Sequence, residues 1–187
     1  YYLEDDEATK KIRDGYKAHI VKMFQLIGQD EKQATKSMEA VMEIETRLAK
    51  KSFNAVEQRN PAANYHMLTL DELKKQIPGF DWDAYINAVG VKGVTSLNVS
   101  QIEPVQEAVA IINELPMDKQ KAYLQWKLID SAASYLSDAF VAQNFEFYGK
   151  VMSGKKEDQP RWKKAVGTVN GVLGEAVGQM YVEKYFP

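Results

Sequence analysis

Apolar residues recur at helical spacing through almost the whole chain of 187 residues, and this periodicity limits the fold more than any other feature. In the first segment they fall every three or four residues until Gly28, as on one face of a helix. Asp30 is placed to cap a second such segment, which fades near Val56. The two faces consist of Ile12, Tyr16, Ile20, Met23 and Ile27, and of Ala34, Met38, Val41, Ile44 and Leu48.

Five further segments carry helix signals. Thr69 and Glu72 form a capping box that opens a helix over 70–76, and the other predicted ranges are 82–89, 104–115, 118–154 and 160–186. Residues 58–68 are interpreted as an ordered connection, and the one candidate strand, within 91–100, has no evident pairing partner. We therefore predict an all-α, multi-helix lobe of about seven helices, several of them long, with little or no β-structure and no visible division into two domains.

The last predicted helix has an unusual composition. Four glycines fall along one side of it, and each would cost a helix interior about 1 kcal/mol relative to alanine. Such a stripe (Gly167, Gly171, Gly174 and Gly178) predicts close packing against another element, so that a larger residue at Gly174 would be destabilising. We therefore expect a central, buried helix. It ends on Tyr181, Val182, Tyr185 and Phe186 without a capping motif, and these residues need a cover from elsewhere.

Composition excludes several classes of function. Lys and Arg total 24 against 26 Asp and Glu, so the chain lacks the basic surplus typical of nucleic-acid binding, and we predict no nucleic-acid partner. The absence of cysteine rules out disulfides, thiolate zinc ligands and a thiol nucleophile. No apolar run approaches the ~18 residues of a membrane span.

The sequence offers few residues for catalysis or metal binding. His19 and His66 lie far apart and outside the His-Glu-x-x-His spacing of zinc peptidases, so we interpret both as structural in preference to ligands. The stretch from Gly149 to Lys156 is similar to a phosphate-binding loop, but Lys156 stands where a magnesium-binding Ser or Thr is required. We assign no catalytic, metal-binding or cofactor-binding residue to this segment, and its substrate-contacting residues stay unknown.

Three weaker signals have ordinary explanations. Ser100, Ser131 and Ser137 lack the setting of a catalytic nucleophile. Glu39 and Glu43 lie one helical turn apart among basic residues, which is typical of a solvated face. Asn98, Val99 and Ser100 form a glycosylation sequon of a kind that chance produces in a chain of this length.

Several motifs together resemble a known family. Residues 160–166 (PRWKKAV) followed by 173–183 (LGEAVGQMYVE) are similar to the amino-terminal region of neprilysin-like zinc metallopeptidases, which include endothelin-converting enzymes and bacterial oligopeptidases. Residues 59–66 (RNPAANYH) with 67–73 resemble the family's loop and capped helix, and residues 123–129 (YLQWKLI) resemble its long helix. The likeness spans essentially the whole chain in the family's order.

The resemblance implies a parent zinc metalloendopeptidase that hydrolyses oligopeptides. In the family, zinc is held by a His-Glu-x-x-His helix and a later Glu, none of which occurs in residues 1–187. Residues 1–187 would then be a single noncatalytic helical lobe, excised from a larger chain, which walls the central cavity and restricts substrate size. Its partners would be the downstream zinc-binding lobe and oligopeptide substrates.

Two further expectations follow from the resemblance. The absence of cysteine departs from the disulfide-linked animal members and favours a bacterial enzyme. The family also implies an extracytoplasmic location, whether periplasmic, cell-surface or secreted. The alternative to the peptidase-lobe hypothesis is a self-standing helical interaction or scaffold module. A His-Glu-x-x-His motif in a longer reading frame would discriminate between the two hypotheses.

Overall fold

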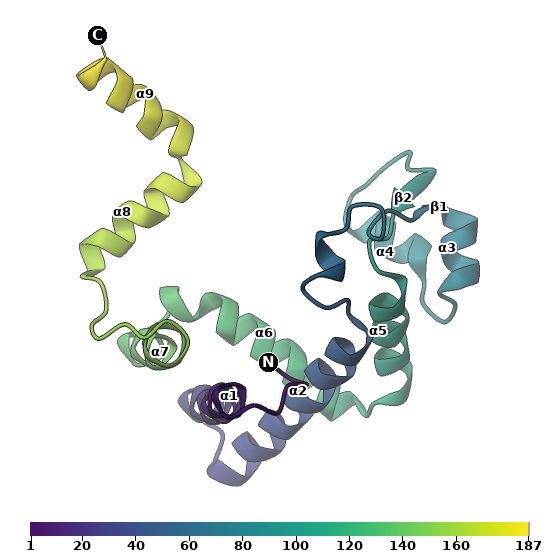
Figure 1. Ribbon diagram of the computed structural model, residues 1–187, viewed down its shortest axis with the longest axis horizontal. Coiled ribbons are helices and arrows are strands. Elements are labelled where there is room, and N and C mark those ends of the chain that lie inside the picture. Colours follow the sequence, from purple (N-terminus) through teal and green to yellow (C-terminus); the bar gives the residue numbers. More distant parts are fainter. Residues whose placement is uncertain (187) are drawn as a thin grey trace. The chain divides into compact units, whose positions relative to one another are not determined.

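The computed structural model describes residues 1–186, and helices dominate that part of the chain (Figure 1). This confirms the predicted all-α class. The α-helices are α1 Glu7–Leu26, α2 Glu31–Lys51, α3 Leu70–Gln76, α4 Trp82–Ala88, α5 Ile102–Glu114, α6 Met117–Ala132, α7 Asp138–Asn144, α8 Arg161–Val172 and α9 Gly174–Tyr185. Short 3-10 turns, η1 (Glu57–Arg59) and η2 (Ala133–Tyr135), and a π-helical segment, η3 (Phe145–Val151), lie between them.

The cap predicted at Asp30 is confirmed for α2, and the structure shows a similar cap at Asp6 for α1. Their carboxylates accept hydrogen bonds from the main-chain N–H groups of Gln33 and Thr9 at 2.8 and 2.9 Å. Gly28 lies in the connection between α1 and α2 and has φ +94°, a backbone conformation that favours glycine. The capping box of Thr69 and Glu72 opens α3 as predicted.

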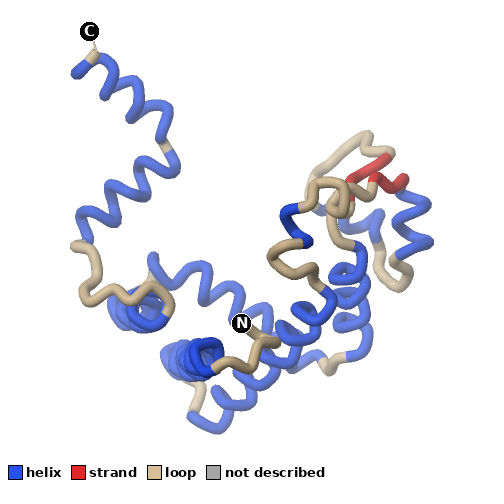
Figure 2. The backbone as a smooth tube through the Cα atoms, viewed as in Figure 1, coloured by secondary structure: helices blue, strands red, loops and turns tan. Residues whose placement is uncertain are grey.

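A two-stranded antiparallel sheet corrects the prediction for residues 58–100. β1 (Met67–Thr69) pairs with β2 (Ser96–Asn98), and Leu68 lies opposite Leu97 (Figure 2). The strand predicted within 91–100 thus has a pairing partner. That partner, β1, lies where the sequence suggested the end of a connection and the cap at Thr69. A strand of three residues has too little alternation of apolar and polar residues to be recognised. Its partner also lies far away in the sequence, and periodicity carries no information on such a pairing.

Both of the longest predicted helices are broken. In the segment predicted to be helical over 118–154, the first α-helix, α6, ends at Ala132. Leu136 then has an extended backbone (φ −85°, ψ −167°) before α7 begins. The segment over 160–186 is interrupted at Leu173 (φ −122°, ψ 33°), between α8 and α9. Apolar spacing continues across both breaks, which is why periodicity missed them.

Contacts divide the chain into two compact units, Tyr1–Asn144 and the part from Phe145 onward. The first unit contains two hydrophobic clusters. In the larger, α1, α2 and α6 lie side by side (Figure 1) around Trp126, which is fully buried. Its other buried members are Ile20, Met23, Phe24, Ala34, Val41, Ile129 and Ala133. The smaller cluster joins the sheet to α3 and α5 through Leu68, Leu73, Ile77, Val99 and Val109.

The second unit lacks a comparable core among its described residues. No residue of α8 or α9 is buried, so the prediction of a central buried helix is wrong for the structure of this chain. A Cβ atom added at Gly167, Gly171, Gly174 or Gly178 would meet no heavy atom within 4 Å. The glycine stripe therefore packs against nothing in residues 1–186, and the expected overpacking at Gly174 is also wrong for this chain.

A polar chain crosses the larger cluster of the first unit. The indole N–H of Trp126 donates to the hydroxyl of Tyr16 at 3.0 Å, and Tyr16 and Tyr2 both donate to Oε2 of Glu45, at 2.9 and 2.8 Å. Burial raises the pKa of Glu45, although the two tyrosine donors act in the opposite direction. Burial and the carboxylate of Glu45 raise the pKa of both tyrosines.

Replacing Glu45 with Gln should remove one source of pH dependence from the stability of the first unit. A carboxyl whose pKa is higher in the folded than in the unfolded state stabilises below its unfolded pKa, and that contribution disappears as pH rises through the folded pKa. The amide does not ionise and keeps an oxygen acceptor for both hydroxyls. In urea titrations, the unfolding free energy of E45Q should therefore rise relative to that of the parent between pH 4 and pH 7. The control variant E39Q, at an exposed site of α2, should show no such relative rise. Parallel pH curves for E45Q and the parent would contradict this account.

Gly149 and Gly171 should respond to alanine in opposite directions. A Cβ at Gly149 would lie 2.2 Å from Cδ2 of Phe145, so G149A must displace the ring, at a cost of about 1–3 kcal/mol. At Gly171 nothing opposes the methyl group, and G171A should stabilise α8 by about 1 kcal/mol. Amide hydrogen exchange in η3 and α8 measures both effects. Equal protection changes of the same sign would show that the two sites have similar surroundings.

Candidate functional site

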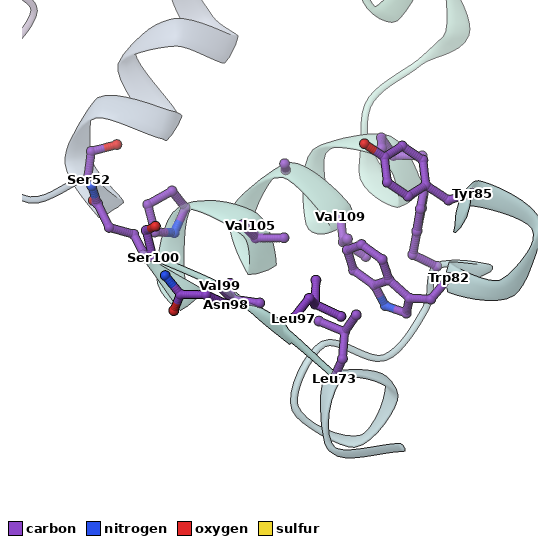
Figure 3. Close-up of a pocket in the computed structure, with 15 residues that line it drawn as sticks. Ser52, Leu73, Trp82, Tyr85, Leu97, Asn98, Val99, Ser100, Val105 and Val109 are labelled. Carbon is purple, nitrogen blue, oxygen red and sulfur yellow. The ribbon is translucent and has the colours of Figure 1, made fainter. Parts of the chain in front are cut away.

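One concave site in the described residues is an apolar groove of the first unit, with a volume of about 590 Å³ (Figure 3). That size falls within the ~300–1,000 Å³ of ordinary ligand pockets. The groove lies between β2 with the residues that follow it, α5, and the aromatic residues around the start of α4. Its lining is Ser52, Leu73, Phe80, Trp82, Tyr85, Leu97, Asn98, Val99, Ser100, Gln101, Pro104, Val105, Ala108, Val109 and Ile112.

The turn between α3 and α4 fixes the aromatic wall of this groove. The indole N–H of Trp82 donates to the carbonyl of Ile77 at 2.8 Å, and the ring of Phe80 packs edge-on against Trp82 at 4.8 Å. Gly79 turns the chain with φ +88°, and its carbonyl accepts a hydrogen bond from the side chain of Asn113 on α5 at 3.1 Å. These contacts hold the aromatic rings against α5.

Ion pairs tie the surrounding helices together. Arg47 of α2 bonds Glu107 and Glu114 of α5 at 2.5 and 2.8 Å, and these partners raise the pKa of the guanidinium. Lys74 of α3 bonds Asp83 of α4 at 2.7 Å. All five charged side chains lie outside the groove lining, so the groove itself is walled by neutral residues.

A second hollow, between α2 and the start of α6, is polar and has a volume of about 510 Å³. Lys36 with Asp118 (2.9 Å) and Lys119 with Glu43 (2.5 Å) already pair across it. Glu39 and Glu43, which the sequence suggested were a solvated face, both line this hollow. Four of the five charged side chains that line it are therefore paired with one another.

The two histidines lie far apart in the first unit and take part in its packing. His19 is buried; Gln143 lies 3.1 Å from its Nδ1, and Asp130 lies 3.7 Å from its Nε2. Nδ1 of His66 lies 3.1 Å from the carbonyl of Val99, beside the sheet. Within residues 1–186, no three His, Cys, Asp or Glu side chains gather in the manner of a metal site.

The other sequence signals occupy structural positions. Gly149 lies within η3, and Gly154 (φ +64°) follows it at the end of the helical stretch. The hydroxyl of Ser131 donates to the carbonyl of Leu128 at 3.0 Å. The side chain of Asn98 accepts from the N–H of His66 and donates to the carbonyl of Asn64, at 2.7 and 3.2 Å. Sequence reasoning missed the groove, because its walls come from segments that only the sheet and the α3–α4 turn bring together.

Exposed apolar residues are concentrated in α8 and α9 of the second unit. Trp162 is 64% exposed and Phe186 is 65% exposed, and the rings of Tyr181 and Tyr185 lie 4.9 Å apart. The exposure expected at the chain's last helix is confirmed. We refer to this set as the α8–α9 apolar residues: Trp162, Val166, Val169, Val172, Leu173, Met180, Tyr181, Val182, Tyr185 and Phe186.

Comparison with solved structures defines the class of protein. The chain aligns over its whole length with the zinc metalloprotease Zmp1 of Mycobacterium tuberculosis, with 31% identity, in an open state (TM-score 0.91) and bound to an inhibitor (TM-score 0.92). It covers 29% and 28% of those chains. PepO of Lactobacillus rhamnosis shares the fold at 17% identity, with a TM-score of 0.79. The fold is therefore that of part of a zinc metalloprotease chain.

The sequence comparisons identify the family. The model described as Peptidase family M13 matches residues 1–187, and the chain belongs to this family, in its N-terminal region. Endothelin-converting enzyme 1 of Rattus norvegicus is 27% identical, and membrane metallo-endopeptidase-like 1 of Homo sapiens is 28% identical, each over the whole chain. The chain spans about a quarter of these relatives, 25% and 26%. The resemblance to neprilysin-like and endothelin-converting enzymes is thereby confirmed.

The α8–α9 apolar residues should make the 187-residue chain bind a hydrophobic dye, because exposed apolar patches attract such probes. The double variant V182E/F186E should lose most of the dye fluorescence. The double variant T168E/N170E adds the same charge at exposed polar positions of α8 and should keep the signal. Equal signals from both variants would place the dye site elsewhere.

Proposed function

We propose that residues 1–187 form the noncatalytic N-terminal helical lobe of a zinc metalloendopeptidase that hydrolyses oligopeptides. The observation that carries the proposal is the match of family M13 over the whole chain, with full-length structural alignment to an inhibitor-bound zinc metalloprotease at 31% identity. The zinc ligands and catalytic residues would lie downstream, in a zinc-binding lobe that this sequence does not contain. The helical lobe would wall the central cavity and restrict the size of substrates.

The α8–α9 apolar residues support a partner within the same protein. These ten large apolar residues, eight of them within α8 and α9, lie open to solvent, and exposed patches of this kind are typical of interaction surfaces. The glycines of the same helices leave room for a close approach, since no described atom lies within 4 Å of a Cβ built on them. We propose that the downstream zinc-binding lobe packs on this surface.

The location belongs to the same proposal. Among residues 1–186, no helix combines the length and apolar content that crossing a bilayer requires. We propose a bacterial, extracytoplasmic enzyme, because family M13 matches the whole chain and the aligned Zmp1 structures come from Mycobacterium tuberculosis.

Zinc content and peptide hydrolysis test the proposal directly. The longer protein should retain zinc and cleave oligopeptides, whereas residues 1–187 alone should do neither, because an open catalytic zinc site requires three protein ligands. Zinc held stoichiometrically by residues 1–187 through dialysis against a weak chelator would contradict the assignment, as would hydrolysis that survives further purification. An independent helical interaction module would be indicated by a longer reading frame without the His-Glu-x-x-His motif.

Gly174→Leu should separate the isolated chain from the longer protein. In residues 1–186 no heavy atom outside the local backbone lies within 4 Å of a Cβ built at Gly174, so the leucine should leave stability unchanged or improve the helix by up to about 1 kcal/mol. In the longer protein it should cost about 1–3 kcal/mol, because the side chain would overpack a close contact. Urea midpoints of both forms measure the effect, with Gly154→Leu (φ +64°) as a control that should be strained in each. Equal midpoint shifts for G174L in both forms would show that the downstream lobe does not cover this face.

A further inference from the structure

The groove of the first unit adjoins an open sheet edge. β2 is one of only two strands in the described sheet, so its side away from β1 has no strand partner. The N–H of Val99 donates to the carbonyl of His66, and the N–H of Leu70 donates to that of Thr95. In an antiparallel ladder these bonds fix the alternation, so the main-chain N–H and C=O groups of Ser96 and Asn98 point away from β1.

The groove adjoins the C-terminal end of this strand. Leu97 and Asn98 of β2 line it, with side chains on opposite faces of the sheet, and residues 99–101, which continue the chain toward α5, line it as well. The lining therefore follows the course of the main chain and is not confined to one face. Ser96, Asn98 and Ser100 are exposed, and the side-chain amide of Asn98 is already bonded to main-chain groups of His66 and Asn64.

The far wall of the groove is neutral and largely apolar. Val105 and Val109 of α5 face Leu97 and Val99, and Trp82 closes one end (Figure 3). Ala108 of α5 also lines the groove. The indole N–H of Trp82 and the side-chain oxygen of Gln101 are already bonded, to Ile77 and to the N–H of Phe53. Because no Asp, Glu, Lys or Arg lines the groove, a charged side chain entering it would lose its hydration without finding a partner.

We propose that this groove is a peptide-binding site, in which an extended segment pairs with the open edge of β2 and places a neutral apolar side chain against Trp82, Val105 and Val109. An extended peptide presents alternating donors and acceptors at strand spacing, and this matches the outward groups of Ser96 and Asn98. The neutral lining selects an aliphatic or aromatic side chain. The site lies wholly in the first unit, so the proposal goes beyond the proposed function and does not depend on the downstream lobe.

A blocked peptide tests the site in the 187-residue chain. The probe is acetyl-Thr-Val-Thr-Phe-Thr-Val-amide, titrated into ¹⁵N-labelled protein, and the matched control replaces Phe with Lys. The amide resonances of Ser96 and Asn98 should shift with saturation, and the Lys peptide should bind about tenfold or more weakly, the factor typical of losing one well-buried anchor. No saturable shift, or equal affinity for the Lys peptide, would overturn the proposal.

N-methylation of the probe distinguishes strand pairing from simple apolar contact. Methyl groups at alternate amides that face β2 should abolish binding, whereas methylation of the intervening amides should be tolerated, because the side-chain period of a strand is two residues. If every methylated peptide bound equally, the groove would take apolar groups without strand pairing, and the proposal would be wrong.

Two variants locate the site on the protein. Ala108→Trp should fill the groove and weaken probe binding about tenfold or more, whereas Glu103→Trp, exposed on the same helix outside the lining, should not. Ser96→Pro removes an outward N–H without removing a ladder bond and should also weaken binding. Thermal unfolding of each variant verifies folding. Should A108W fail to fold, S96P alone decides the matter, and unchanged affinity in a folded S96P protein would refute the pairing with β2.

Discussion

The first unit depends on how one buried indole is accommodated. Trp126 is fully enclosed where α1, α2 and α6 meet, and a buried N–H needs an acceptor. Tyr16 supplies that acceptor, and its hydroxyl donates a hydrogen bond to Glu45, which also accepts one from the hydroxyl of Tyr2. The polar chain thus links the N-terminal segment, α1, α2 and α6. Removing the hydroxyl of Tyr16 would leave the buried indole N–H of Trp126 without this acceptor, at a typical cost of ~1–3 kcal/mol.

This core also places the groove. α5 lies against α2 through Arg47, and the sheet with the α3–α4 turn is then held on α5 by the smaller hydrophobic cluster. The second unit has no such support among its described residues, since α8 and α9 bury none of their side chains. The two units of the chain therefore differ in how much of their own apolar surface they bury. That contrast is the physical basis for our proposal that α8 and α9 form an interface with a downstream lobe.

Sequence reasoning found the elements whose signals are local. The caps at Asp30 and Thr69 and the faces of α1 and α2 were predictable, because each depends on residues within a few positions. The breaks at Leu136 and Leu173 and the pairing of β1 with β2 were not, because they depend on backbone geometry or distant partners. The groove was invisible for the same reason. The family assignment rested on motifs in residues 160–183 and was confirmed, although the same residues were wrongly expected to be buried within this chain.

We propose that the remainder of an M13 peptidase packs on α8 and α9. Amide hydrogen exchange on the 187-residue chain at low concentration and on the longer protein tests this packing. We expect strong protection of α1, α2 and α6 in both proteins, and weak protection of α8 and α9 in the short chain that rises to the same level in the long one. Protection of α8 and α9 that is already strong in the short chain, or that stays weak in the longer protein, would show that no such packing occurs.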